Sequence, residues 1–524
     1  ILKILETIKE NGINNEDLEK AKKIAKFDFL ESLQTAEGRA LDLITSEALT
    51  NDYLFSGDYL DKISAVSDDD IKKAAAAYLD ESKANTILLM PKQDISPVLP
   101  QSAAGKKAGG RDISSHVMPN GMRIIICEDH SLPICTISAL FLGGVRFETK
   151  SDNGISQLTA ALILDGTSER KEEDIKAAIE SMGGNINSIS GANSFGIAVN
   201  LMSADWKKGF EIMSDAVQRS TFDNSKIEKE KTLTLAGVKE RDDNIVRSGL
   251  LLLKENFFKG NPYSMDSLGR EESVQRIRRE DILRFYESYT SPSHMVLAVT
   301  GDVNKDDFLE EAKKRFGSDK RIDVKFPAIP GRDGLQKQEE VTGSMEREQS
   351  ILLIGFPAVK ITDSDRYAFE VIDSIMSGSD GRLFNDVRSS MGISYSLGSF
   401  FVPGIEPGSQ IFYAVTTSKN IKTAKEAILK EIKKLKTEPV FDEELGAVKR
   451  HLIASNVINL EENAALNLKM ALDELYGLGY KNFESYSSKI NDVTAGQIKR
   501  VANQYLNPDN CLIVTIYGTK ESDK

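Results

Sequence analysis

The feature that most constrains the fold of this sequence is an internal repeat. Three segments of 14 residues begin at Val66, Ile277 and Val493. Each starts with a branched apolar residue, has an Ile five residues later and a Tyr seven residues after that, and leads into an apolar run. The three starts lie 211 and 216 residues apart, which predicts tandem domains of about that size.

The residues before each copy also agree in kind. Residues 17–54, 226–258 and 442–477 are long, charged and amphipathic, which indicates helices that pack one face on a sheet. The first copy is preceded by too few residues for a complete repeat, and the chain begins at Ile1 without a Met. We therefore expect the last part of one repeat, followed by two complete repeats.

Two stretches rich in Pro and Gly mark the boundaries between the repeats. Residues 92–115 are typical of a flexible linker, and a second break lies near residues 317–339. The predicted organisation has four parts, listed here in chain order: residues 1–92 as the last part of a preceding half, 93–115 as a hinge linker, 116–320 as one repeat and 340–524 as a second repeat.

The first complete repeat mixes strands with helices. Strands are expected at residues 121–126 and 134–141, and two more within 185–202 around Gly191. Residues 153–164 carry an apolar stripe at helical spacing and predict a buried helix. Each repeat is therefore expected to be α+β, with a mainly antiparallel sheet and helices packed on one face.

Composition narrows the class of partner. The chain has 67 Lys and Arg against 80 Asp and Glu, a net charge of −13, which argues against nucleic acid or an anionic membrane as the main partner. No apolar run approaches the length of a membrane span. Cys127 and Cys135 flank a probable turn, where they either meet across two strands or, as we favour, remain buried thiols. No two histidines are close enough for a helical metal motif.

The stretch from Gly381 to Ser396 predicts a helix followed by a strand. Its apolar residues fall four apart until Gly392, after which β-branched and aromatic residues dominate. Arg388 then lies near the end of the helix and Tyr395 near the start of the strand. On these residues alone, an Arg packed along a helix and a Tyr half buried in a sheet is the favoured interpretation.

Three stretches match a known family: residues 120–129 (NGMRIIICED), the long run 261–302, and 381–396. On these the chain resembles, over nearly its whole length, the insulinase/pitrilysin-type zinc metallopeptidases, which include the mitochondrial processing peptidases. The resemblance implies α+β repeats of about 200 residues, two to a half, and two halves facing each other like a clam shell.

The sequence departs from this family at the zinc site. The family carries an inverted motif, His-x-x-Glu-His, on a helix that here corresponds to residues 154–161. Gln157 replaces the first His, Ala160 the catalytic Glu and Ala161 the second His, and Gly237 aligns with the distant Glu ligand. A catalytic zinc needs three imidazole or carboxylate ligands, so this chain is expected to bind no zinc.

In the resembling family the zinc-less half often supplies an Arg/Tyr pair to the active site, and Arg388 and Tyr395 stand at the positions of that pair. The resemblance implies that Arg388 positions the peptide and that Tyr395 donates to the oxyanion of the tetrahedral intermediate. Zinc is then expected in a missing N-terminal half, on the same polypeptide or a separate subunit, and peptides are the expected substrates.

Two functions remain open at this stage. The favoured one is the C-terminal portion of a zinc metalloendopeptidase that cleaves peptides or unfolded segments in a closed chamber and is inactive alone. The alternative is a non-catalytic structural or interaction subunit derived from the same family. The compartment is not determined by the sequence; the periplasm is the expectation for a bacterial protein.

Overall fold

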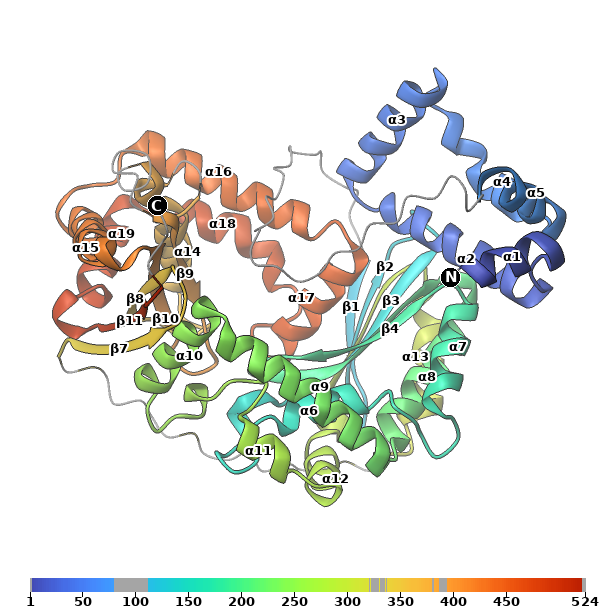
Figure 1. Ribbon diagram of the computed structural model, residues 1–524, viewed down its shortest axis with the longest axis horizontal. Helices are drawn as coiled ribbons and strands as arrows, with labels where there is room; N and C mark the ends of the chain where they lie inside the picture. The colour runs from blue at the N-terminus through green and yellow to red at the C-terminus, as the bar shows by residue number, and fades with distance from the viewer. Residues whose placement is uncertain are drawn as a thin grey trace.

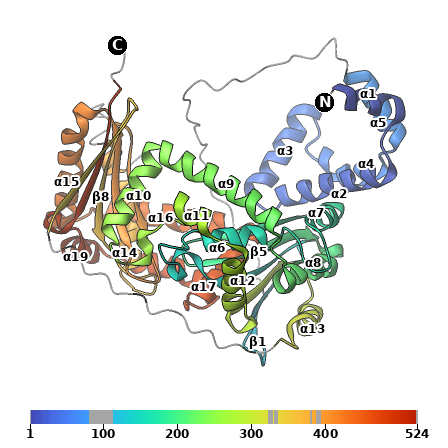
Figure 2. The same ribbon diagram turned by 60° about the horizontal axis from the view of Figure 1, so that its bottom comes forward.

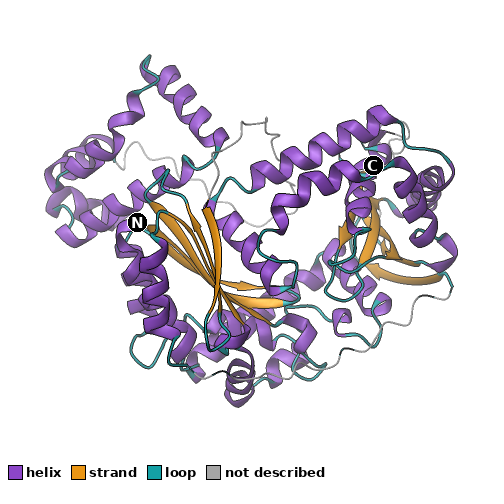
Figure 3. Ribbon diagram, turned by 180° about the vertical axis from the view of Figure 1, so that it is seen from behind, coloured by secondary structure: helices purple, strands orange, loops and turns teal. Residues whose placement is uncertain are grey.

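The computed structural model describes residues 2–79, 112–319, 321, 329, 335, 337–378, 381–385 and 394–520. These residues form two β-sheets with helices around them and a separate group of helices near the N-terminus (Figures 1 and 3). Both sheets are mostly antiparallel, so the expected α+β class is confirmed. The N-terminal helices are α1 (Leu2–Asn11), α2 (Asn15–Ser32), α3 (Ala36–Thr50), η1 (Phe55–Asp58), α4 (Tyr59–Ala65) and α5 (Asp68–Tyr78).

The first sheet has six strands in the order β1-β2-β6-β3-β5-β4. Only the β2–β6 pair is parallel. The strands alternate with helices in the chain, as the sequence predicts, and the strands expected at 134–141 and within 185–202 are present as β3, β4 and β5. The bounds are β1 (Asp112–Val117), β2 (Arg123–Glu128), β3 (Ile134–Leu142), β4 (Asn185–Ser190), β5 (Ser194–Met202) and β6 (Met295–Gly301).

The second sheet has five strands in the order β7-β11-β8-β10-β9. Its single parallel pair is β7–β11. Without β1, the first sheet has the same order of strands, so the two repeats share one topology. The bounds are β7 (Glu339–Met345), β8 (Ser350–Pro357), β9 (Ser394–Val402), β10 (Ser409–Thr416) and β11 (Leu512–Gly518).

Each repeat packs most of its own helices on one face of its own sheet, where they form a large apolar core. No helix in the described ranges is long and apolar enough to cross a membrane. The helices of the first repeat are α6 (Ile155–Leu162), α7 (Glu172–Ser181), α8 (Trp206–Arg219), α9 (Asn224–Asp243), α10 (Ile245–Phe257), α11 (Glu271–Arg276), α12 (Arg279–Tyr289) and α13 (Lys305–Phe316). Those of the second are α14 (Arg366–Met376), α15 (Ile421–Thr437), α16 (Asp442–Asn459), α17 (Asn463–Leu475), α18 (Tyr486–Asp492) and α19 (Ala495–Tyr505).

The opposite face of each sheet is covered by one helix of the other repeat. Helix α10 packs on β8 and β11 of the second sheet, and α17 packs on β3 and β6 of the first (Figures 1 and 2). At Gly249 of α10 the approach is close, since a Cβ there would lie 3.1 Å from Ile351 Cγ2. On the first sheet, Leu466 and Met470 of α17 are fully buried in the corresponding apolar cluster. The two repeats therefore exchange helices and share their cores.

The N-terminal helices attach to the first repeat through α2. Phe27 and Leu30 of α2 form a small apolar cluster with Ile134 at the start of β3. The backbone N–H of Ala36, at the start of α3, donates to Glu461 at 2.7 Å. Beyond these contacts α3 projects away from both sheets (Figure 1).

The three cysteines form no disulfide. Cys127 and Cys135 lie on β2 and β3, which are separated in the sheet by β6, and all three cysteines are buried thiols. Of the two interpretations that the sequence left open, the structure supports buried thiols.

Candidate functional site

Helix α6 carries three of the four positions that the resemblance assigns to the family's zinc site. It begins after Gly154, whose φ of +99° is readily adopted only by glycine. Ala160 is fully buried, whereas Gln157 and Ala161 are half-buried. The helix is thus part of the apolar core. Of the three predicted positions on it, only Gln157 carries a polar side chain, an amide.

Gly237 lies on α9, which packs against α6. A Cβ at Gly237 would find its nearest neighbours at 3.8 and 4.0 Å, both methyl carbons of Leu268, so a small side chain has room there. The structure therefore brings the four predicted positions to two adjacent helices. None of the four carries an imidazole or a carboxylate, so these residues do not fit zinc. Nor do the described residues contain a group of three or more His, Cys, Asp or Glu side chains that could hold a metal ion.

The N-terminus of α6 is held by a buried carboxylate that the sequence did not single out. Glu148 accepts hydrogen bonds from the backbone N–H of Gly154 and Ser156, both at 2.9 Å, and from Asn153 Nδ2 at 2.7 Å. Burial raises the pKa of Glu148 to about 7, although these hydrogen bonds oppose the rise. Its role here is to cap the helix, because all its contacts are with the turn that starts α6.

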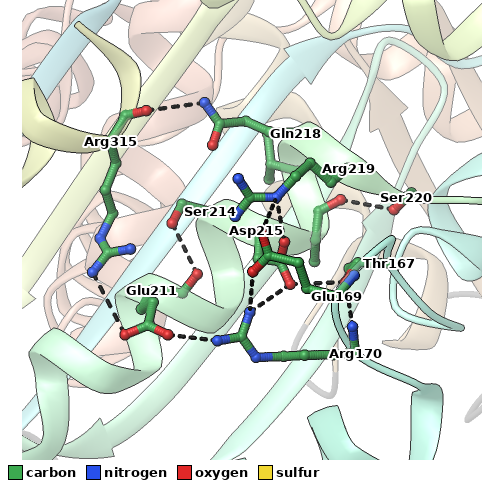
Figure 4. A network of polar contacts seen from close by, with 12 residues as sticks. Thr167, Glu169, Arg170, Glu211, Ser214, Asp215, Gln218, Arg219, Ser220 and Arg315 are labelled. Carbon is green, nitrogen blue, oxygen red and sulfur yellow. Dashed lines mark hydrogen bonds and ion pairs between the residues drawn. The ribbon is translucent and has the colours of Figure 1, made fainter.

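A second polar cluster fixes the turn after α6 (Figure 4). Asp215 of α8 is completely buried and accepts from Arg170 Nη1 and Arg219 Nε, each at 2.6 Å, and from Thr167 Oγ1 at 2.8 Å. Burial alone would raise the pKa of Asp215, but these donors outweigh it and hold the pKa below its usual value. Both carboxylate oxygens of Asp215 accept from an arginine or a hydroxyl, so we interpret the cluster as structural support for the turn.

The predicted Arg/Tyr pair is only partly within the described residues. Arg388 lies outside them. Tyr395 lies on β9, an edge strand of the second sheet, where the pairing with β10 shifts register: Ser396 pairs with Val415 and Ser394 with Thr416. The backbone of β9 therefore carries a bulge-like irregularity near its start.

The stretch that leads to the pair is anchored at its start. Arg382 binds Glu444 of α16 in a two-pronged ion pair, with Nε–Oε1 at 2.7 Å and Nη2–Oε2 at 2.6 Å. The pKa of Arg382 is raised by this hydrogen bond to Glu444. The rest of the predicted helix, from residue 386 on, lies outside the described residues.

An open, mainly apolar cavity of about 330 Å³ lies between the two repeats. One side is formed by α10 and by Leu268, the neighbour of Gly237. The other side is formed by Phe400 and Val402 of β9 and by Ile411 of β10. Leu268, the neighbour of Gly237, and the strand that carries Tyr395 thus line one cavity, an arrangement that sequence spacing cannot reveal.

Comparison with known proteins agrees with this geometry. A family model described as insulinase (peptidase family M16) matches residues 123–270, and one described as the peptidase M16 inactive domain matches residues 276–452. The chain is 24% identical to a Bacillus subtilis protein named an uncharacterized zinc protease, YmxG, over 76% of this chain and 97% of that protein. It is 29% identical to the mouse protein named cytochrome b-c1 complex subunit 1, mitochondrial, over 41% of this chain and 44% of that protein.

A solved structure shows the same fold. The crystal structure of a protease from Helicobacter pylori superimposes with a TM-score of 0.73 at 18% identity, covering 78% of this chain and 99% of that one.

Fold and site together define a peptidase-like protein of two helix-exchanging α+β repeats. The four positions that the resemblance assigns to the zinc site carry no imidazole or carboxylate. The chain belongs to the M16, or insulinase, peptidase family, as the two matched regions and the relatives named zinc proteases show.

Proposed function

We propose that this chain is the C-terminal, zinc-less portion of a two-part zinc metalloendopeptidase that cleaves peptides or unfolded segments. The observation that carries the proposal is the pairing of α6 and α9: both helices are retained and packed, yet the four ligand positions offer no imidazole or carboxylate. A partner half with the His-x-x-Glu-His motif, on the same polypeptide or a separate subunit, would hold the zinc. Zinc there would activate the attacking water.

Within this proposal Arg388 and Tyr395 act on the substrate. The guanidinium of Arg388 offers a rigid fork of donors to substrate carbonyls. The hydroxyl of Tyr395 donates to the oxygen that becomes negative in the tetrahedral intermediate.

The proposed domain organisation follows the repeats. Residues 1–92 would belong to the partner half, and 116–320 and 340–524 would be the two repeats of the zinc-less half. Residues 93–111 of the predicted hinge linker lie outside the described residues, and its last residues, 112–115, belong to β1 and pair with β2.

The test is cleavage of a quenched, unstructured peptide by this chain alone and by this chain mixed with zinc and a partner half. The partner half is cloned from the same genome by its His-x-x-Glu-His motif. We expect no cleavage by the chain alone and cleavage on mixing. Tyr395→Phe should lower kcat by about 100-fold without weakening assembly, since one oxyanion donor is lost. Tyr517→Phe, at an exposed tyrosine of β11, is the matched control.

Zinc-dependent cleavage by the isolated chain would contradict the interpretation of Gln157, Ala160, Ala161 and Gly237. A folded complex that leaves the peptide intact would favour the alternative, a non-catalytic structural or interaction subunit. One observation favours that alternative: the identity to the mouse cytochrome b-c1 subunit, at 29% over a shorter region, exceeds the 24% to the Bacillus subtilis protein.

A further inference from the structure

Helix α3 occupies the same place in its repeat as α10 and α17 do in theirs. Each of the three follows a long helix (α2, α9 or α16) and precedes a short 3-10 helix: η1, η5 (Pro262–Ser264) or η9 (Asn482–Ser485). Helices α10 and α17 each cover a sheet of the other repeat. Because α3 has the equivalent position in its repeat, we expect it to cover a sheet as well.

The residues of α10 and α17 that face a sheet are apolar, and so are the residues at the same positions of α3. Counted from the first helical residue, the eighth and ninth positions are Leu252 and Leu253 in α10 and Met470 and Ala471 in α17. Leu253, Met470 and Ala471 are fully buried, and Leu252 packs against the same apolar cluster as Leu253.

In α3 the same two positions are Leu43 and Ile44, and they remain 45% and 64% exposed. The side of α3 that does pack is polar: Ser46 is buried, and Asp42 accepts a hydrogen bond from Ser56 Oγ at 2.6 Å. A helix with its polar side packed and its apolar side exposed reverses the pattern of a soluble amphipathic helix. The apolar face of α3, defined by Ala40, Leu41, Leu43, Ile44 and Ala48, thus lacks a covering layer among the described residues.

A second, independent position points the same way. Tyr78 of α5 corresponds to Tyr289 and Tyr505, both of which pack against the apolar core of their own repeat. Tyr78 is 82% exposed. The N-terminal partial repeat therefore lacks, among the described residues, packing partners at two places where the complete repeats have them.

Neither sheet of this chain can accept α3. The first sheet is covered on one face by its own helices and on the other by α17, and the second sheet by its own helices and by α10. A second copy of the chain has the same two sheets, already covered in the same way. The occupant must bring a sheet with an open apolar face.

We propose that the apolar face of α3 docks on the open β-sheet face of a further α+β repeat of this same fold. The inference rests on the proposed function, because that repeat is assigned to the zinc-bearing partner half. Helix α3 then packs on a sheet of another repeat, as α10 and α17 do. The partner half is thereby joined to this chain through a shared apolar core.

The experiment measures binding of the full chain to the partner half, produced as a separate chain. The decisive variant is Ile44→Asp, and its matched control is Leu49→Asp, at an exposed apolar residue about 140° around the axis of α3 from Ile44. Both sites are exposed in the isolated chain, so both variants should keep its unfolding midpoint. We expect Ile44→Asp to weaken binding at least about thirtyfold, since a large apolar contact is lost and a carboxylate is buried. Leu49→Asp should change binding less than about threefold.

Labelling gives a second readout that does not depend on affinity. The three native cysteines are buried, so a cysteine introduced as Ile44→Cys is the reactive one under native conditions. Its reaction with a maleimide should be fast in the isolated chain and at least about tenfold slower in the complex, whereas Leu49→Cys should react at similar rates in both.

Each outcome decides the matter. Equal affinity of the Ile44→Asp variant and the wild type, failure of the wild-type chain to bind the partner half, or protection of the Ile44→Cys variant by self-association would overturn the docking inference. A complex that depends on Ile44 but leaves the peptide uncleaved would support the inference and contradict the proposed peptidase function.

Discussion

Ser138 on β3 donates a hydrogen bond to Asn467 on α17 at 2.5 Å, across 329 residues of sequence. Both side chains are buried, and Asn467 Nδ2 also donates to the carbonyl of Thr136 at 3.2 Å. A helix of the second repeat is thereby hydrogen-bonded to the sheet of the first. The exchange of helices is therefore fixed by directional contacts as well as by apolar packing.

Replacing this amide should destabilise the first repeat. Asn467→Ala is expected to lower the free energy of unfolding by about 1–3 kcal/mol, because buried polar groups of β3 lose their partner. Urea unfolding followed by the fluorescence of Trp206, the only tryptophan, measures it. Asn187→Ala on the exposed part of β4 is the control and should change little. An Asn467→Ala variant as stable as the control would show that the hydrogen bond contributes nothing.

Gly237 on α9, which is predicted to replace a zinc ligand, should tolerate a side chain, and a side chain there should make the protein more stable. Gly237→Ala is expected to raise the free energy of unfolding by about 0.5–1 kcal/mol, because glycine is costly inside a helix and the new methyl has room. The contrasting variant is Gly209→Ala on α8, where a Cβ would lie 2.0 Å from Leu201 Cδ1, so this change should destabilise. Thermal and urea unfolding of the two variants should move in opposite directions. Loss of stability in Gly237→Ala would mean that α9 does not keep this geometry.

Much of the fold could be predicted from the sequence because its signals are local. The repeated segments fix the number and size of the repeats, and apolar periodicity places β3, β5 and α6 within a few residues of their observed bounds. Substitution at Ala160 and Gly237 could also be recognised from the sequence, because those residue types have no donor atoms whatever their surroundings.

The exchange of helices could not be predicted, because an amphipathic helix has the same periodicity whichever sheet it covers. The roles of Glu148 and Asp215 also escaped the sequence analysis. Glu148 precedes the helix it caps by six residues, and Asp215 meets Arg170 only after α8 folds against the turn that follows α6. The strand that carries Tyr395 begins at Ser394, one residue from its predicted start, while the roles of Arg388 and Tyr395 stay predictions.

Substitution within the arginine cluster around Asp215 should lower the free energy of unfolding more than substitution at an exposed ion pair. Asp215→Asn removes the buried carboxylate that Arg170 and Arg219 share, although both arginines keep Glu169 as a partner. We expect a loss of about 2–3 kcal/mol in the free energy of unfolding, the usual cost of losing hydrogen bonds to a buried charged group. The exposed pair Arg247–Glu240 gives the control: Arg247→Ala should cost at most about 1 kcal/mol. Similar losses for the two variants, measured by urea unfolding, would contradict the assignment of Asp215 as structural support.

The buried cap of α6 should make stability depend on pH. Burial raises the pKa of Glu148 from 4.5 to about 7, so the folded chain holds this proton more tightly than the unfolded chain. The contribution of Glu148 to stability is therefore complete below about pH 4.5 and is lost as the pH rises towards 7, by about 3 kcal/mol in total. Glu148→Gln cannot titrate, so the difference in unfolding free energy between pH 5 and pH 7.5 should shrink in this variant. Glu173→Gln on the exposed side of α7 should keep the wild-type dependence. If the Glu148→Gln variant loses stability over this range as steeply as the wild type, another group is responsible and Glu148 is ionised throughout.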